Sequence, residues 1–358
     1  MRSRHILRWL PSYLWRLRHR MRCAPRHVIV AVCDHFEPFW RKADSEQANV
    51  RVREWTRLLP QLAARYCDAD GRKPKHTFFC AMDEMTDEQL TILLSLKEQN
   101  LAEFELHLHH RNDSASSLTH LLIEARNRMW KLGCLPCAAA DGAVRYGFIH
   151  GNWALANTRP DGDWCGVPDE LKVLLDTGCY ADFTFPSAPD ATQPTLTNAL
   201  YYPSITACGP GALDHGIESR CGCSHTGRLL LITGPIGLNF DSRKWGVLPR
   251  IENGALRQGQ DVTPQRIRRW LDQRIGVQQR PEWVFVKLYC HGAQERDWPV
   301  LLGPGYHRLH NGLRGECARL GCQLHYASAR EMANMIFALE EGWQGDPEGA
   351  RNYRIILP

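Results

Sequence analysis

Six consecutive apolar residues, Val28 to Cys33, are the strongest constraint on the fold of this 358-residue chain. Such a run is typical of a strand that is covered on both faces, as in a parallel sheet. Further strand patterns alternate with helical ones and cover 104–109, 146–150, 180–185, 229–233, 284–291 and 323–327. This alternation favours a parallel α/β architecture. Because no dinucleotide or P-loop glycine fingerprint is present, we expect a barrel rather than an open doubly wound sheet.

Two capping boxes predict where helices begin within this alternation. Thr86 with Gln89 opens one helix, and Ser328 with Glu331 opens the closing helix. Other helices are expected at 118–132, 170–177 and 263–274, and the glycine-rich stretch 207–227 is expected to be an inserted loop. With no internal repeat and no long linker, we expect three parts: a basic amphipathic segment 1–26, one domain 27–340 and a tail 341–358.

Three histidines close one strand pattern, in the run ELHLHH over 105–110. Strand side chains alternate between two faces, and His107 and His109 would therefore share a face. His110 could reach that face only where the chain curls beyond the strand end. Two imidazoles at the mouth of a strand suit a transition-metal ion. The alternative is a set of surface or hydrogen-bonded histidines.

Polar residues also lie in or just after other strand patterns: Asp34, His35, His150, Asn152, Trp153, Asp182 and His291. In α/β barrels the catalytic groups gather at the carboxyl ends of the strands. A set of imidazoles with a carboxylate there supports metal-assisted hydrolysis, since the ion keeps positions open for water and a substrate carbonyl.

In this order and spacing, these residues resemble the motifs of the polysaccharide deacetylases of the NodB-homology type, carbohydrate esterase family 4. Asp34 and His35 stand where the family's first strand ends in two acids, a catalytic base and a metal ligand. His107 is similar to the first of two metal-binding histidines in the family. The second histidine, four residues later, is absent here, and His109 or His110 would take its place.

The resemblance covers about 28 to 338. The segment 147–153 occupies the place of the third motif without its arginine, Asp182 matches the acid of a later strand, and His291 matches the general acid. The family's fold is a deformed (β/α)7 barrel, and its reaction removes an acetyl group from an N- or O-acetylated sugar with one divalent metal ion.

The resemblance implies a role for each of these residues. Asp34 would be the base and His291 the acid. The metal ligands would come from His35, His107, His109 and His110. The substrate pocket would be lined by His150, Asn152, Trp153 and Asp182. Zinc is the first expectation for the metal, with cobalt, nickel or manganese as alternatives. Two rival functions are hydrolysis of a non-sugar amide on the same barrel and carbohydrate binding without catalysis.

The amino-terminal segment is rich in arginine, with Trp9, Leu14 and Trp15 interleaved at roughly helical spacing. It could lie on an anionic membrane surface, bind an acidic partner or pack on the domain. It lacks the apolar stretch of a signal peptide or membrane span, and we expect a cytoplasmic protein, with peripheral contact at the inner membrane face as a further option. Elsewhere the charges are mixed, without the basic and aromatic stripe of a nucleic-acid-binding protein.

Fourteen cysteines are expected to be free thiols in the cytosol. One alternative is a structural zinc site in which Cys134 and Cys137 meet Cys221 and Cys223.

Overall fold

The computed structural model describes residues 3–19 and 23–357; residues 1–2 and 20–22 of the predicted basic segment, and residue 358, lie outside the described residues. The helices are α1 Ser3–His19, α2 Ser45–Ala63, α3 Asp87–Glu98, α4 Ala115–Lys131, α5 Glu170–Asp176, α6 Pro264–Asp272, α7 Trp298–Leu301, α8 Pro304–Leu320, α9 Ala329–Glu340 and α10 Pro347–Ala350. The strands are β1 His27–Phe36, β2 His76–Ala81, β3 Ala102–Leu108, β4 Cys137–Ala138, β5 Tyr146–His150, β6 Cys179–Asp182, β7 Leu200–Tyr202, β8 Ile217–Glu218, β9 Leu230–Ile232, β10 Gly237–Lys244, β11 Leu248–Glu252, β12 Trp283–Cys290, β13 Gln323–Tyr326 and β14 Ile355–Ile356.

Within the described residues, ten strands form one large sheet, in the order β12-β1-β2-β3-β5-β6-β9-β7-β8 with β13 beside β1. Neighbours from β12 to β9 pair in parallel, whereas β7 pairs antiparallel with both β9 and β8. The strand β13 pairs with the first half of β1, and β2 pairs with its second half. The architecture is therefore mixed α/β with a mostly parallel central sheet, which confirms the predicted class.

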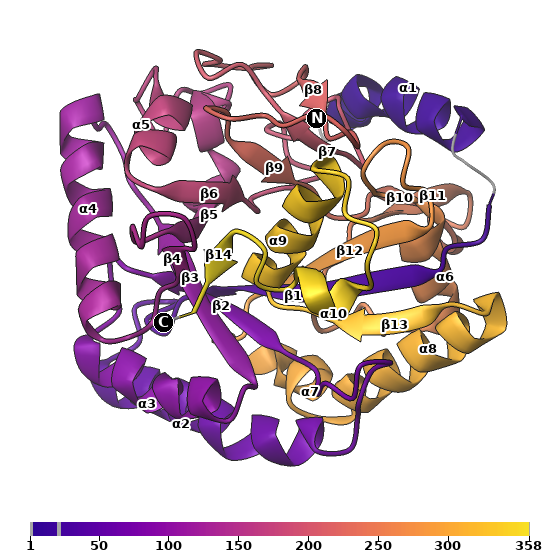
Figure 1. Cartoon of the computed structure of the whole chain (residues 1–358), viewed down its shortest axis with the longest axis horizontal. Helices are drawn as coiled ribbons and strands as arrows, with labels where there is room; N and C mark the ends of the chain where they lie inside the picture. Colours follow the sequence, from indigo (N-terminus) through magenta and orange to yellow (C-terminus); the bar gives the residue numbers. More distant parts are fainter. Residues whose placement is uncertain (1–2, 20–22, 358) are drawn as a thin grey trace.

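The sheet has two covered faces, and strand side chains alternate between them. Val28, Val30 and Val32 of β1 belong to a core shared with α2, α3, α4, α6 and α8, which we call the outer face. The residues between them, Ile29 and Ala31, belong to a second core shared with α9, which we call the inner face. All twelve residues of α9 are buried. Figure 1 shows α2, α3, α4 and α8 around the outside of the molecule and α9 nearer its middle.

The sequence predicted some of these elements and missed others. The capping boxes at Thr86 and Ser328 are confirmed, and both open the predicted helices. The strand β5 has the predicted bounds. The elements α2, β2 and α8 and the β10–β11 hairpin were not predicted from the sequence. Within 207–227, expected to be a loop, β8 is the one regular element among the described residues.

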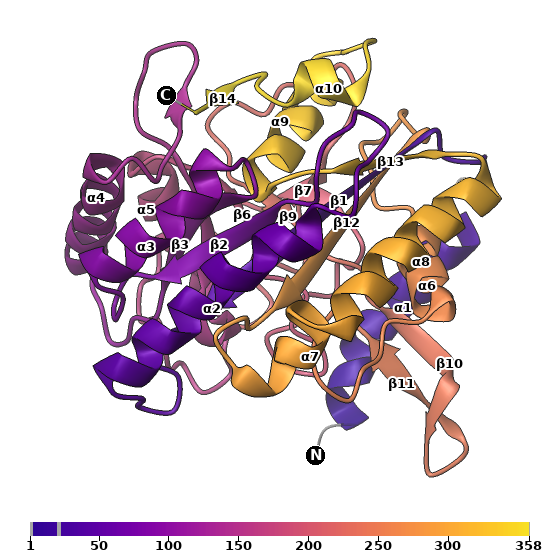
Figure 2. The ribbon, with the colours of Figure 1, turned by 90° about the horizontal axis from the view of Figure 1, so that it is seen from below.

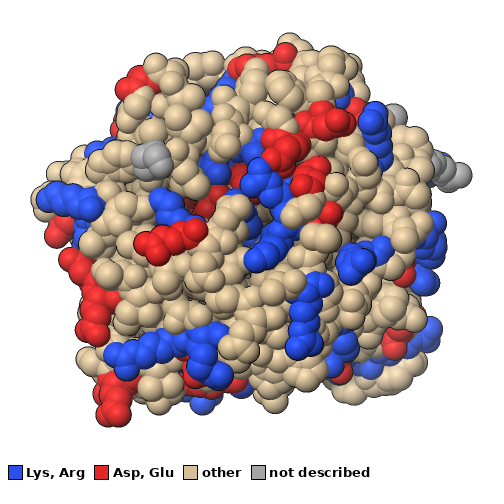
Figure 3. Space-filling view, turned by 60° about the horizontal axis from the view of Figure 1, so that its bottom comes forward, with Lys and Arg blue, Asp and Glu red and all other residues tan. Residues whose placement is uncertain are grey.

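The helix α1 packs on the domain. Trp9 and Tyr13 are buried against it, and Arg16 pairs with Glu218 at 2.7 Å. Figure 2 shows α1 close to the β10–β11 hairpin. None of the described helices combines the length and the apolar character that crossing a membrane requires. On the face drawn in Figure 3, basic and acidic side chains are interspersed.

The predicted tail, from 341 onward, also packs on the domain. The strand β14 pairs antiparallel with β4. Arg351 is buried and donates hydrogen bonds to the Tyr326 carbonyl at 2.6 Å and to Asp70 at 2.8 Å. In the described chain, the packing therefore continues across position 340, the predicted boundary between the domain and the tail.

Candidate metal centre

An imidazole cluster lies on the inner face, at the carboxyl ends of β1 and β3. Its members are His35, Glu37, His107 and His109, and we call it the open cluster. One donor atom from each of His35, Glu37 and His107 lies within 4.8 Å of the others. Glu37 Oε1 is 3.3 Å from His107 Nε2 and 3.6 Å from His109 Nε2. The side chains of Glu37 and His109 are 18% and 23% exposed, so solvent reaches this cluster.

The rings of His107, in β3, and of His109, just after it, are each held by a hydrogen bond at Nδ1. His107 Nδ1 donates to the Ile149 carbonyl at 2.8 Å, and its Nε2 faces Glu37 Oε1 at 3.3 Å, where it can donate to the carboxylate as an imidazolium or bind a metal ion. His109 Nδ1 lies 3.2 Å from Asp83 Oδ2, so a carboxylate orients this ring from behind. A hydrogen bond at the far nitrogen is how proteins fix the tautomer and orientation of a metal-binding histidine. Both Nε2 atoms are thereby directed toward Glu37.

His35 has an unsatisfied ring nitrogen. The residue is 4% exposed, and its Nε2 makes no hydrogen bond with any described residue. Burial, and then the neighbouring rings of His291 and His107, hold the pKa of His35 well below its usual value. Burial therefore favours the neutral ring, and its buried Nε2 lacks a partner, which is costly unless something binds there.

Glu37 supplies the negative charge of the open cluster. Burial opposes its ionisation, but the hydrogen bond from His107 and the charges of the nearby imidazoles outweigh burial and lower its pKa to about 2. An ionised carboxylate facing three imidazole rings is a ligand set that a divalent cation satisfies.

A cavity of about 260 Å³ is lined in part by His291, Trp153, Asn253 and Tyr289, and its link to the open cluster is through His291. The ring of His291, which follows β12, lies 4.9 Å from that of His35 between centroids. Asn253 is 5% exposed and donates to Tyr289 Oη at 2.9 Å, while its Oδ1 has no hydrogen-bond partner among the described residues. The cavity is thus lined by an imidazole, an indole and a phenol ring.

Asp34, expected to be the base, lies on the other side of the sheet. Its carboxylate accepts hydrogen bonds from His76 Nε2 at 2.8 Å and from the Gly292 N–H at 2.6 Å, and it is fully buried. Neighbours in a strand point to opposite faces, so Asp34 and His35 cannot both face the open cluster. We therefore withdraw the base role. Asp34 instead holds the chain directly after His291.

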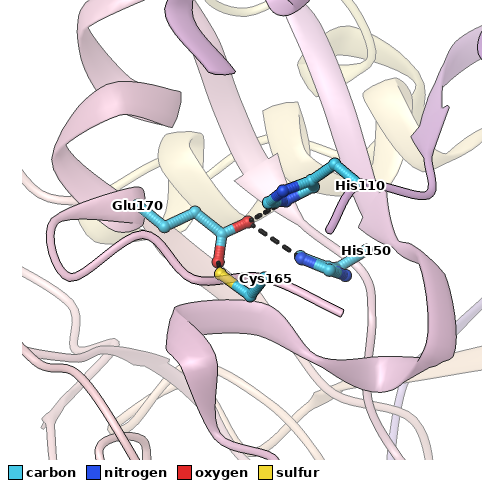
Figure 4. A group of neighbouring side chains, drawn as sticks. All are labelled: His110, His150, Cys165 and Glu170. Atoms are coloured by element: carbon cyan, nitrogen blue, oxygen red, sulfur yellow. Dashed lines mark hydrogen bonds and ion pairs between the residues drawn. The ribbon is translucent and has the colours of Figure 1, made fainter. Parts of the chain in front are cut away.

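His110 and His150 also belong to the outer face, where they meet Cys165 and Glu170 (Figure 4). We call these four residues the closed cluster. The rings of His110 and His150 are 4.5 Å apart between centroids, and the Nε2 atom of each lies 3.2 Å from Glu170 Oε1. Two expectations are corrected. His110 does not join His107, and His150 is fully buried and cannot line a substrate pocket.

The electrostatics of the closed cluster also follow from its burial. Desolvation lowers the pKa of His150 to about 4 and raises the pKa of the Cys165 thiol. Burial opposes the ionisation of Glu170, but the two imidazoles outweigh it and lower the pKa of this carboxyl.

Of the remaining predicted pocket residues, one lines the cavity and another does not. Trp153 lines the cavity, and both Asn152 and Trp153 adopt left-handed backbone with φ of 55° and 52°. The two oxygens of Asp182 accept hydrogen bonds from the Thr184 N–H at 2.9 Å and the Thr184 hydroxyl at 2.8 Å. Asp182 therefore braces a turn, and its expected contact with substrate is not supported by this geometry.

Four residues of these sites were not predicted from the sequence as site residues: Glu37, Asp83, Cys165 and Glu170. A signal for Glu37 was present, because it lies two positions after His35 and shares its face. Asp83 follows β2, a strand that was not predicted. Cys165 and Glu170 come from a long loop and the start of α5, and their approach to His150 depends on tertiary structure.

Other ligand-type groups among the described residues already have partners. Asp34 is bonded to His76, and Asp70 accepts from both His325 and Arg351. Within the described chain, the four cysteines considered for a zinc site do not form a group.

Comparison with known proteins gives no further assignment. No protein-family model matches this chain, and no curated protein matches it.

Proposed function

We propose that this protein is a metal-dependent hydrolase that removes an acetyl group from an N- or O-acetylated sugar or polysaccharide precursor. The observation that carries the proposal is the open cluster, in which donor atoms of His35, Glu37 and His107 lie within 4.8 Å of one another. We propose a deformed (β/α)7 barrel as the fold. In its support, the parallel strands from β1 to β9 follow one another in chain order, and the site lies at their carboxyl ends.

The open cluster fits one divalent ion. Two histidines and one glutamate form a ligand set used by catalytic zinc sites. Ligands bound at about 2.0 Å in a tetrahedron lie roughly 3.3 Å apart, close to the 3.3 Å between Glu37 Oε1 and His107 Nε2. The ion would also satisfy the unpartnered Nε2 of His35. Zinc is the first expectation, and cobalt, nickel or manganese suit the same donors.

When bound, the ion would polarise the acetyl carbonyl and acidify a water molecule. Because Asp34 points to the other face of the sheet, it could not act as the base. His109 would accept the water proton at Nε2, since its Nδ1 proton is hydrogen-bonded to Asp83. His291, on the other side of His35, would donate a proton to the departing amine or hydroxyl. Glu37 stays ionised throughout and holds the imidazoles around it.

The cavity favours a single sugar unit. Its volume of about 260 Å³ lies just below the usual range of ligand pockets, about 300 to 1,000 Å³. Trp153 would pack against the apolar face of a sugar ring. Asn253 would hold Tyr289 at the cavity wall through its 2.9 Å hydrogen bond to Tyr289 Oη.

The test is acetate release by zinc-loaded protein from N-acetylhexosamine derivatives, with small cyclic amides as the comparison. We expect release from the acetylated sugar and loss of release in His107→Ala. Turnover of cyclic amides alone would favour the non-sugar amide hydrolase. Bound sugar with no turnover under any of the four metals would favour a carbohydrate-binding barrel.

We also propose that α1 contacts the surface of a membrane. It exposes Leu7, Leu14 and Trp15, with Arg18 beside them. Apolar residues flanked by arginine suit an anionic lipid surface. Co-sedimentation with vesicles of anionic but not neutral lipid is expected, and Trp15→Glu should reduce it. A membrane-proximal cytoplasmic enzyme would act on a precursor rather than on polymer outside the cell.

A further inference from the structure

We propose that the closed cluster is a second metal site, structural rather than catalytic, in which His110, His150, Cys165 and Glu170 bind one zinc-like divalent cation. This site lies on the opposite face of the sheet from the open cluster, and it does not depend on the hydrolase activity proposed above.

Four separate segments bring the donor atoms together. His110 follows β3, His150 ends β5, Cys165 lies in the loop before α5, and Glu170 is the first residue of α5. One donor atom from each lies within 4.8 Å of the others. Figure 4 shows the two imidazoles and the thiol converging on the carboxylate.

Three distances between these atoms are close to those around a tetrahedral ion. Both Nε2 atoms are 3.2 Å from Glu170 Oε1, and Cys165 Sγ is 3.3 Å from Glu170 Oε2. Donors bound at about 2.0 to 2.3 Å in a tetrahedron lie roughly 3.3 to 3.8 Å apart. Two nitrogens, one thiolate and one carboxylate are also donors that zinc accepts together.

His150 supplies the independent sign of a missing partner. Its Nδ1 donates to the Gly151 carbonyl at 2.6 Å, which leaves a lone pair on Nε2. That nitrogen is buried, faces Glu170 Oε1 at 3.2 Å and makes no hydrogen bond with any described residue. This buried nitrogen therefore lacks a partner, and a cation bound by both His150 and Glu170 would supply one.

Protons alone satisfy only part of the cluster: the Cys165 thiol donates to Glu170 Oε2 at 3.3 Å, and His110 Nε2 is hydrogen-bonded to Glu170 Oε1 at 3.2 Å. Protonated His110 could bridge Glu170 and Asp113, which lie 3.2 Å from its two ring nitrogens. His150 Nε2 would still face the carboxylate without a partner. A metal ion would bind both imidazoles, the thiolate and Glu170 together. Asp113 would then orient His110 from behind, as outer carboxylates do at metal sites.

The site is closed, as structural zinc sites are. Its four residues are at most 5% exposed, so no position is open to a substrate. The loop that it would hold contains several non-glycine residues with left-handed backbone: Asn152, Trp153, Ala156, Asn157 and Trp164. Such conformations persist only where the surroundings fix them. The ion would tie this loop to β3, β5 and α5 and so keep Trp153 at the cavity.

The experiment is cobalt substitution of the full-length protein under reducing conditions. Wild-type protein should retain two equivalents of cobalt and show a thiolate-to-cobalt charge-transfer band in the near ultraviolet. Cys165→Ser should lose the band and one equivalent. Cys179→Ser removes another buried thiol and should keep both. His107→Ala should lose the other equivalent and keep the band.

A folded wild-type protein without the band overturns the proposal, and so does a Cys165→Ser variant that keeps the band. If Cys165→Ser does not fold, Glu170→Gln is the second variant, and it should weaken cobalt retention about tenfold or more. Unchanged retention in that variant also overturns the proposal. A protein with the band but no hydrolase activity would refute only the proposed function.

Discussion

The open and closed clusters draw on the same sequence region but have opposite environments. His107 and His109 point to the inner face, whereas His110 points to the outer face and meets His150. Glu37 and His109 of the open cluster are partly exposed, and the members of the closed cluster are buried. His109 and His110 are adjacent in the chain, yet His109 belongs to a cluster that solvent reaches and His110 belongs to a buried one.

The contrast also explains which chemistry each site can support. A catalytic ion needs an open position for water and substrate, whereas a structural ion is enclosed by protein ligands. The cysteine lies in the closed cluster, where no solvent reaches the thiol. The open cluster has His291 and the His109–Asp83 pair beside it, which are groups able to move protons.

The largest effect is expected for His107→Ala. Removing this imidazole should empty the open cluster and lower turnover by about a thousandfold, since the ion supplies several kcal/mol of transition-state stabilisation. The measurements are metal content by elemental analysis and acetate release. His120→Ala on α4, where the side chain is 82% exposed, is the control. Full metal occupancy in His107→Ala would contradict the assignment of the open cluster.

Glu170→Ala should mainly reduce stability. It removes the carboxylate that the His110 and His150 rings face and that accepts the Ala156 N–H at 2.6 Å. Loss of one partner from a buried charged group costs about 3 to 5 kcal/mol. Urea unfolding followed by circular dichroism should show this loss, while Glu124→Ala on the surface of α4 should not. An unchanged midpoint in Glu170→Ala would mean that the closed cluster holds nothing together.

Asp34→Asn should keep the metal and lower kcat by about ten- to a hundredfold, the range typical of outer partners at metal sites. The amide cannot accept from both His76 and Gly292 as the carboxylate does, and the chain after His291 should shift. The measurement is kcat and metal affinity side by side. Equal loss of metal binding and of turnover would place Asp34 in the open cluster, against its outer-face position.

The smallest effect is expected for Asn253→Ala. Loss of one hydrogen bond of about 1 kcal/mol should raise KM for an acetylated sugar roughly fivefold and leave kcat nearly unchanged. Asn127→Ala, an exposed position on α4, is the control. A fall in kcat without a change in KM would argue that the cavity is not where the sugar binds.

The sequence by itself determined the local features of this protein. The apolar run 28–33 forms β1, the capping boxes at Thr86 and Ser328 open helices, and His107 shares a face with His109. Each of these follows from strand periodicity or from hydrogen bonds within a few residues. The same periodicity already separated Asp34 from His35 and grouped Glu37 with His35.

Only the tertiary structure decided which face carries the open cluster and what completes each site. Strand alternation predicts that Asp34 and His35 point to opposite faces of the sheet. The packing of α9 on one face and of α2 on the other determines which of the two meets His107. Cys165 and Glu170 reach His150 across a loop that no local pattern describes. Long-range packing brings such residues together, because their contacts span many positions and leave no periodic trace in the sequence.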